Sequence, residues 1–213
     1  EKTLVKAIAS NPCFFEARKS RANVLHTLKR FEEALAEIDS ALALVASDPD
    51  AHFVRANILR ELKRFPEAVA SYDQSLSLRP AHAEALLNKA QALTSLLRPL
   101  EALAAYDAAL RVNPDFAEAH YRRAILLQDL QRFGEAEAAF GEAVRCEEDQ
   151  PKLFGQWIGS SLMTCNWQGL PAKLGRLAHK IQEGKNAASP FWTLTAGLGL
   201  ELTKRATITM MQE

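Results

Sequence analysis

The sequence predicts an all-α protein made of stacked antiparallel helix pairs, on three observations. A five-residue motif of the form Arg-x-x-Glu-Ala begins at residues 30, 64, 98 and 132, so it recurs every 34 residues. Small residues return at the same places in each 34-residue unit, where two helices of a pair would have to cross closely. Prolines near the ends of the units mark points where a helix cannot continue.

The motif divides most of the chain into four units of equal length. The expected units are residues 15–48, 49–82, 83–116 and 117–150. Position 8 of each unit is alanine, as is position 20, and position 24 is a bulky residue. The corresponding residues are Ala22, Ala56, Ala90 and Ala124; Ala34, Ala68, Ala102 and Ala136; and Ile38, Tyr72, Tyr106 and Phe140. A larger side chain at position 8 or 20 would force the two helices apart.

The period and these positions resemble the tetratricopeptide (TPR) repeat. The resemblance implies a right-handed superhelix, or α-solenoid, in which the first helix of each pair lines a concave groove. One departure from the family pattern is position 7, usually apolar but here Arg21, Arg55, Lys89 and Arg123. A long basic stem can cover apolar surface while its charged head stays in water, so the departure is compatible with the fold.

The segments that flank the four repeats follow the pattern less closely. Residues 1–14 match the second helix of a truncated repeat, which suggests that the sequence is part of a longer protein. Residues 151–213 show apolar residues at helical spacing without the 34-residue signature. We expect them to form a degenerate helical cap over the end of the core, or a linker that leads into a further domain.

The groove positions predict a peptide-binding site. By resemblance to the family, positions 5, 6 and 9 face the groove, and position 9 carries amides in three consecutive repeats. The candidate residues are Lys19, Asn23, Asn57, Asn88, Gln91 and Arg122. An amide offers both a donor and an acceptor, as does the backbone of an extended peptide. The alternative is that these residues are ordinary solvated side chains on an exposed helix face.

The carboxylate clamp of chaperone-binding TPR modules is a more specific alternative, and the sequence argues against it. Asn57, Asn88 and Arg122 match that pattern, but Phe53 and Glu118 stand where it requires lysines. Position 2 is acidic in all four repeats, and these carboxylates would repel an acidic tail. They are Glu16, Asp50, Glu84 and Glu118.

The segment after the repeats carries a second resemblance. Cys165-Asn166-Trp167 and, further on, Ser189-Pro190-Phe191-Trp192 resemble the linker between TPR repeats and catalytic domain in bacterial SPINDLY-like relatives of O-linked N-acetylglucosamine transferase. The resemblance implies a protein glycosyltransferase whose catalytic and UDP-GlcNAc-binding residues lie beyond Glu213. Residues 1–213 would then recruit protein substrates, and would hold no catalytic residue and no cofactor. The alternatives are a free-standing adaptor that assembles protein complexes, and self-association through the repeats.

Composition limits the other classes of function. The 26 basic and 26 acidic residues balance, so no overall positive charge favours nucleic acid or anionic lipid. The sequence contains no continuous apolar run of membrane-spanning length and no signal-peptide pattern. The five histidines lack metal-ligand spacing, and the three cysteines lack a Cys-x-x-Cys pair. We therefore expect no metal, reduced thiols and a cytoplasmic location.

Overall fold

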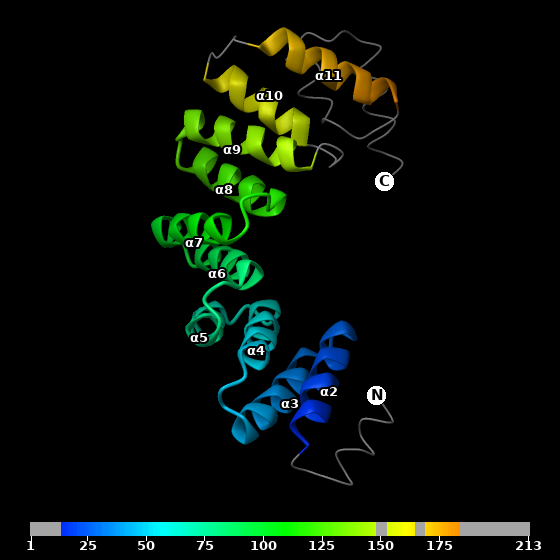
Figure 1. The fold of residues 1–213 in the computed structure, drawn as a ribbon, viewed down its shortest axis with the longest axis vertical. Coiled ribbons are helices and arrows are strands. Elements are labelled where there is room, and N and C mark those ends of the chain that lie inside the picture. The colour runs from blue at the N-terminus through cyan, green and yellow to red at the C-terminus, as the bar shows by residue number, and fades with distance from the viewer. Residues whose placement is uncertain (1–13, 148–152, 165–168, 184–213) are drawn as a thin grey trace. The chain divides into compact units, whose positions relative to one another are not determined.

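A computed structural model describes residues 14–147, 153–164 and 169–183 of the protein, and these residues form helices joined by short connections (Figure 1). The helices are α2 (Phe15–Thr27), α3 (Phe31–Leu44), α4 (Pro49–Glu61), α5 (Phe65–Leu78), α6 (Ala83–Ser95), α7 (Pro99–Val112), α8 (Ala117–Asp129), α9 (Phe133–Cys146), α10 (Leu153–Met163) and α11 (Leu170–Gln182). The predicted all-α class of helix pairs is confirmed.

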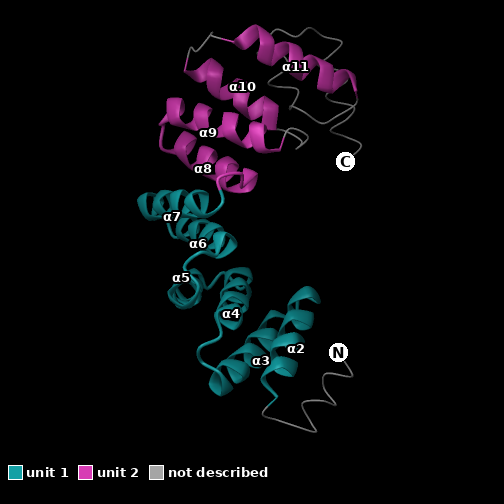
Figure 2. Ribbon diagram, viewed as in Figure 1, with its two compact units in different colours: residues 1–113 teal, residues 114–213 magenta. Residues whose placement is uncertain are grey.

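The protein divides into two compact units, residues 1–113 and 114–213, which we call unit 1 and unit 2 (Figure 2). Unit 1 holds the pairs α2–α3, α4–α5 and α6–α7. Unit 2 holds the pair α8–α9, followed by α10 and α11. The predicted half repeat at 1–14, apart from Phe14, lies outside the described residues, as do residues 165–168 and 184–213 with both linker motifs.

The first helix of each predicted repeat ends in the same turn. Its backbone has a left-handed residue, with φ of 59° at Lys29, 61° at Lys63, 56° at Leu97 and 59° at Gln131. In the first repeat Lys29 N–H donates to His26 O and Arg30 N–H donates to Leu25 O, both at 2.9 Å, which is the Schellman arrangement. Glycine is the usual residue here because a side group disfavours this conformation. The protein forms the turn four times without glycine.

The recurring arginine and glutamate of the sequence motif pair with each other where the second helix begins. Arg30 precedes the first residue of α3, and its Nε and Nη2 donate to the two carboxylate oxygens of Glu33, both at 2.7 Å. Arg64–Glu67, Arg98–Glu101 and Arg132–Glu135 repeat this arrangement. The hydrogen bonds from arginine lower the pKa of each glutamate. The motif therefore marks a helix start, where negative charge is also favoured by the helix dipole.

The predicted crossing residues form the core of each helix pair. The alanines at positions 8 and 20 are completely buried in all four repeats, and so are Ile38, Tyr72 and Phe140 at position 24, with Tyr106 nearly so. Small residues on both helices let the backbones approach closely, and the bulky residue fills the space beside them. This packing explains why the sequence period could be read without a structure.

The basic residues at position 7 join neighbouring helices. Arg55 on α4 donates from Nε to Asp39 of α3 at 2.7 Å, and Lys89 on α6 lies 2.6 Å from Asp73 of α5. Arg21 instead pairs with Glu37 of its own repeat. We expected these charged heads to remain in water. The three are partly buried and paired with carboxylates, which the sequence spacing alone does not reveal.

Helices α10 and α11 close the described part of unit 2. Phe154 and Ile158 of α10 are completely buried. Leu177 of α11 is also completely buried, and Ile181 is 1% exposed. These four residues form one apolar cluster with Val144 of α9. Helix α10 packs against α9 on one side and α11 on the other. These two helices thus pack over the apolar face of α9.

Candidate functional site

The structure brings two of the predicted groove amides into direct contact. Asn88 Nδ2 on α6 donates to Asn57 Oδ1 on α4 at 3.0 Å, and Tyr72 OH on α5 donates to the same oxygen at 2.6 Å. Burial raises the pKa of Tyr72, so its hydroxyl stays protonated as a donor. Both amide side chains are half-buried. Buried Tyr72 thus fixes the position of the Asn57–Asn88 pair through its hydrogen bond to Asn57.

This bonding pattern determines what the two amides offer to a ligand. Asn57 uses its oxygen, so its Nδ2 can donate, and Asn88 uses its nitrogen, so its Oδ1 can accept. No other hydrogen bond within the described residues engages either group. If both amides were turned over, the offered donor and acceptor would exchange places, but one of each would remain. The carbonyl and N–H groups of a peptide backbone complement such a pair.

Gln91 lies one helical turn beyond Asn88 on α6 and contacts a different partner. Arg60 Nη1 of α4 donates to Gln91 Oε1 at 3.3 Å, a long hydrogen bond. Arg60 also pairs with Glu61 at 3.2 Å. Gln91 therefore keeps its amide nitrogen for other partners, while its oxygen faces a guanidinium.

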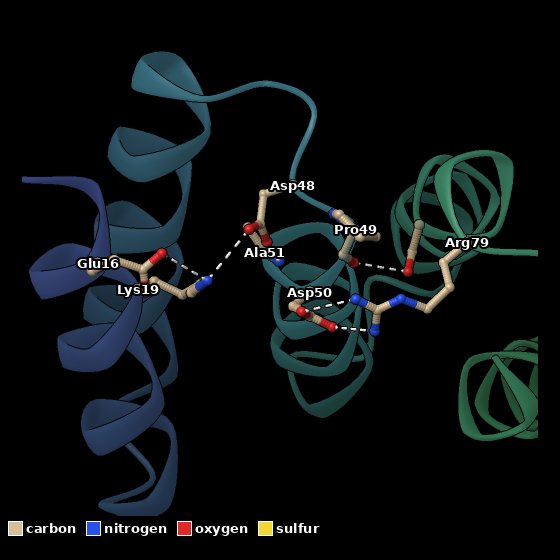
Figure 3. Close-up of polar contacts among 8 residues, drawn as sticks. Glu16, Lys19, Asp48, Pro49, Asp50, Ala51 and Arg79 are labelled. Carbon is tan, nitrogen blue, oxygen red and sulfur yellow. Dashed lines mark hydrogen bonds and ion pairs between the residues drawn. The ribbon is translucent and has the colours of Figure 1, made fainter.

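Lys19, the basic residue among the predicted groove side chains of unit 1, is already engaged by carboxylates of the protein itself (Figure 3). Its Nζ lies 3.2 Å from Glu16 and 3.3 Å from Asp48. Burial alone would lower the pKa of Lys19, but the hydrogen bonds to Glu16 and Asp48 outweigh it and raise the pKa. Asp48 also caps α4 by accepting from Ala51 N–H at 2.6 Å. Lys19 thus ties α2 to the start of α4.

A second ion pair joins the start of α4 to Arg79, the residue that follows α5. Asp50 accepts from Arg79 Nη1 at 2.6 Å and from Arg79 Nη2 at 3.1 Å, and Figure 3 shows the two side chains facing each other. The hydrogen bond from Arg79 lowers the pKa of Asp50. Buried Ser75 donates to Pro49 O at 2.8 Å beside them. The acidic residue at position 2 therefore has a structural partner in this repeat.

The remaining predicted residues are Asn23 in unit 1 and Arg122 in unit 2. Asn23 on α2 is exposed, and no hydrogen bond of its side chain is present among the described residues. Arg122 lies in unit 2 on α8, where its Nε donates to Glu118 at 2.6 Å. Within unit 1 the structure therefore brings together Asn57 and Asn88, places Gln91 on the same helix as Asn88, and gives Asn23 no hydrogen bond to them.

Aromatic residues beside the amide pair were not predicted as part of the site. The ring of Phe53 lies 4.7 Å from the ring of His82 and 6.1 Å from that of Tyr72, measured between centroids. His82 Nδ1 is buried, with no hydrogen-bond partner among the described residues. Phe53 precedes Asn57 by four residues, so both lie on one side of α4. The helical spacing of Phe53 and Asn57 was a signal that could have identified this apolar wall.

Unit 2 contains a separate polar cluster that the repeat pattern of the sequence does not predict. Lys173 Nζ of α11 lies 2.8 Å from Glu137 of α9 and donates to Ser161 Oγ of α10 at 2.8 Å. Ser161 and Thr164 both donate to Glu137, at 2.8 and 3.0 Å. The ammonium also lies 4.4 Å from the Trp157 ring centroid. The Lys173 and Glu137 side chains are only 13% and 10% exposed, and Ser161 is fully buried, so the cluster connects three helices rather than meeting a ligand.

The described residues contain neither a metal-ligand cluster nor a membrane-spanning helix. No three His, Cys, Asp or Glu side chains gather closely enough there to hold a metal ion. None of the helices described has the length and apolar character needed to cross a membrane.

Comparison with known proteins agrees with the class that the geometry defines, a protein of stacked helical hairpins. The family model described as tetratricopeptide repeat matches residues 1–52, 31–83, 53–98 and 87–151. The protein belongs to the tetratricopeptide repeat family. A search of curated proteins gives no match.

Several solved structures share the fold. YrrB, described as a TPR protein with an unusual peptide-binding site, has a TM-score of 0.67 and 20% identity, over 96% of this chain and 97% of YrrB. PilF from Pseudomonas aeruginosa has a TM-score of 0.70 and 15% identity, over 93% and 89% of the two chains. The first TPR unit of Spaghetti (RPAP3), bound to an HSP90 peptide, has a TM-score of 0.54 and 20% identity, over 55% and 93%. At these identities the similarity shows the fold alone.

Proposed function

We propose that this protein is a protein-interaction scaffold, and that unit 1 binds an extended segment of a partner through its backbone. The bond between Asn57 and Asn88 is the observation that carries the proposal, because it leaves one donor and one acceptor side by side. An extended residue presents its carbonyl and N–H toward the same side, as in a β-ladder. The solved TPR structures described with a peptide or a peptide-binding site support this use of the fold.

The neighbouring side chains give this site a preference for particular side chains of the bound peptide. Phe53 and the His82 ring form a partly apolar wall next to the amide pair. Lys19 is held by Glu16 and Asp48, so it does not attract an acidic tail. The ligand would therefore be an extended peptide with an apolar residue near the amide pair, and not the acidic C-terminus of a carboxylate clamp.

Asn88→Ala tests the proposal with little disturbance of the fold, because the Tyr72 hydrogen bond to Asn57 remains. A fluorescent peptide selected from an array of unrelated extended sequences serves as the probe, with affinity measured by anisotropy. We expect the variant to bind about tenfold more weakly, as for the loss of one or two hydrogen bonds. Asn23→Ala, which removes an exposed amide at the repeat position that Asn57 occupies on α4, should bind like the parent.

N-methylation of the probe distinguishes backbone recognition from side-group recognition. Methylating the peptide nitrogen that meets Asn88 removes the donor and should weaken binding to the parent but not further to Asn88→Ala. Equal binding of the parent to methylated and unmethylated peptides would contradict the proposal.

The linker motifs at residues 165–167 and 189–192 favour a narrower version, in which the repeats recruit substrates for a protein glycosyltransferase that uses UDP-GlcNAc. The test is the gene downstream of Glu213: several hundred codons with alternating strand and helix patterns would support it, and a stop codon would support a free-standing adaptor.

We also propose a cytoplasmic location, which the free thiol of Cys146 favours. Self-association, the third alternative, predicts a size by light scattering that grows with concentration.

A further inference from the structure

An open pocket of about 220 Å³ lies between helices α3, α4 and α5 of unit 1. It is lined by Asp39, Leu42, His52, Arg55, Ala70, Ser71 and Gln74, and we call it the Arg55 pocket. Arg55 and Asn57 are two residues apart on α4, which places them about 200° apart around the helix. The pocket is therefore on the opposite side of α4 from the amide pair.

The polar groups of the Arg55 pocket include donors that the protein itself does not use. Arg55 donates from Nε to Asp39 and from Nη1 to Ser71 Oγ at 2.6 Å, and Nη2 has no partner among the described residues. Ser71 is only 2% exposed, and its oxygen accepts from Arg55, so its O–H hydrogen is directed elsewhere. No acceptor for that hydrogen is present within the described residues. A nearly buried hydroxyl needs an acceptor from outside the protein, and a ligand that enters the open pocket can take the place of water there.

Two more side chains complete the lining. Gln74 carries an amide that makes no hydrogen bond to the described residues. His52 Nε2 lies 2.8 Å from Ala46 O, which can only accept, so this ring nitrogen donates its hydrogen to Ala46 and not to a ligand. Leu42 and Ala70 supply apolar walls. Arg55, Ser71 and Gln74 thus supply the donors of the pocket, with hydrocarbon beside them.

The next repeat provides an internal comparison. The same positions at the α5–α6–α7 junction keep the ion pair, as Asp73 and Lys89, but the equivalents of His52, Ser71 and Gln74 are Leu86, Ala105 and Ala108. The ion pair is therefore a feature of both junctions, whereas the donors of Ser71 and Gln74 belong to the Arg55 pocket.

We propose that the Arg55 pocket binds a carboxylate group. A carboxylate accepts from both Arg55 and Ser71, and guanidinium is the group best suited to it. The carboxylate of Asp39, already 2.7 Å from Arg55, opposes a dianion such as phosphate. The volume suits the end of one side chain rather than a large ligand, since drug-sized pockets are about 300–1,000 Å³. The source is either a Glu or Asp side chain of a bound protein or a small free carboxylic acid.

Sodium propionate, which reproduces the end of a glutamate side chain, is the first probe. In a ¹H–¹⁵N NMR titration at constant ionic strength, we expect saturable shifts at the pocket residues of α3, α4 and α5. The uncharged isostere propionamide should bind at least fivefold more weakly. Equal binding of the two compounds, tighter binding of inorganic phosphate, or the absence of localised shifts would each overturn the proposal.

Four variants keep the test independent of stability and of the proposed function. Ala70→Leu fills the mouth of the pocket from an exposed position and should abolish the shifts, whereas Ala104→Leu, the same change one repeat later, should not. Ser71→Ala should weaken propionate binding about fivefold. Asn88→Ala should leave it unchanged, so failure of the peptide site and of the pocket can be told apart. Unaltered propionate binding in Ala70→Leu would overturn the assignment.

The tripeptide acetyl-Ala-Glu-Ala-amide distinguishes the two sources. If it binds at least tenfold more tightly than propionate, the pocket accepts an acidic side chain of a protein. If the two bind equally, it accepts a small free acid.

Discussion

In unit 1 a carboxylate on one helix meets a basic side chain on the next, as Asp39 does with Arg55 and Asp73 with Lys89. In unit 2 the same two repeat positions at the junction of α9 and α10 are Gly141 and Trp157, and the indole packs over the glycine. The repeat-to-repeat junctions of unit 1 are thus partly exposed ion pairs. The last junction of unit 2 is a close contact between one particular pair of helices.

A second position shows the same contrast. Position 21 is buried and apolar in the first three repeats, as Leu35, Val69 and Leu103, but is Glu137 in the fourth. Glu137 is buried against Ser161 of α10, Thr164 just after that helix and Lys173 of α11, all three of which donate to it. An ion pair of the unit 1 kind can join any repeat to the next. The unit 2 junction depends on residues of α9, α10 and α11 that have no counterpart at these positions in the first three repeats.

Removal of Lys173 tests the unit 2 junction most severely. Lys173→Met removes the cation that pairs with buried Glu137, and we expect unit 2 to lose about 3–5 kcal/mol of unfolding free energy. Denaturant unfolding together with hydrogen exchange of α9–α11 measures the loss.

The control is the double variant Glu137→Leu with Lys173→Met, which restores the apolar residue of the other repeats. It should recover stability to within about 1 kcal/mol of the parent or exceed it. A single variant as stable as the parent would show that the cluster contributes nothing to the junction.

Gly141→Asp restores the residue found at this position in unit 1. A Cβ at Gly141 would lie 3.3 Å from Trp157 Nε1, so the variant should lose about 1–3 kcal/mol through overpacking. Thermal unfolding followed by Trp157 fluorescence gives the measurement.

Gly134→Ala is the matched change on the same helix, where a Cβ meets no atom within 4 Å. It should be neutral or stabilise by about 0.5–1 kcal/mol, since alanine favours helix. Equal losses in both variants would mean that Trp157 does not set the close approach.

Lys89→Met in unit 1 should have the smallest effect. The Lys89 and Asp73 side chains are 26% and 52% exposed, and pairs of this kind contribute at most about 1 kcal/mol. Repeating the unfolding measurement in roughly 1 M NaCl should reduce the difference further through screening. A loss as large as that of Lys173→Met would remove the distinction between the two kinds of junction.

The sequence predicted the helix pairs well because each pair is built from contacts that recur every 34 residues. The same period could not show Lys173, since it lies in a helix outside the repeats and reaches a glutamate 36 residues away. The change from Leu35, Val69 and Leu103 to Glu137 was nevertheless visible as a break in the pattern. Such a break inside a regular array is a signal to look for a special partner.

The candidate groove residues illustrate a different limit. Their helical positions followed from the repeat, but their hydrogen bonds did not. Lys19 is held by Asp48, 29 residues away, and Asn57 by Tyr72 and Asn88. Local spacing predicts which way a residue faces, whereas its partners depend on how successive hairpins pack.

The turns that end α2, α4, α6 and α8 have a practical consequence for engineering. Lys29, Lys63, Leu97 and Gln131 share one backbone conformation although their side chains differ in charge, size and polarity, and Leu97 is 88% exposed. The backbone bonds of the turn do not depend on the side group that it carries. Dyes, cross-linkers or affinity handles could therefore be installed at this position in any chosen repeat, giving a series of attachment points at a constant 34-residue interval.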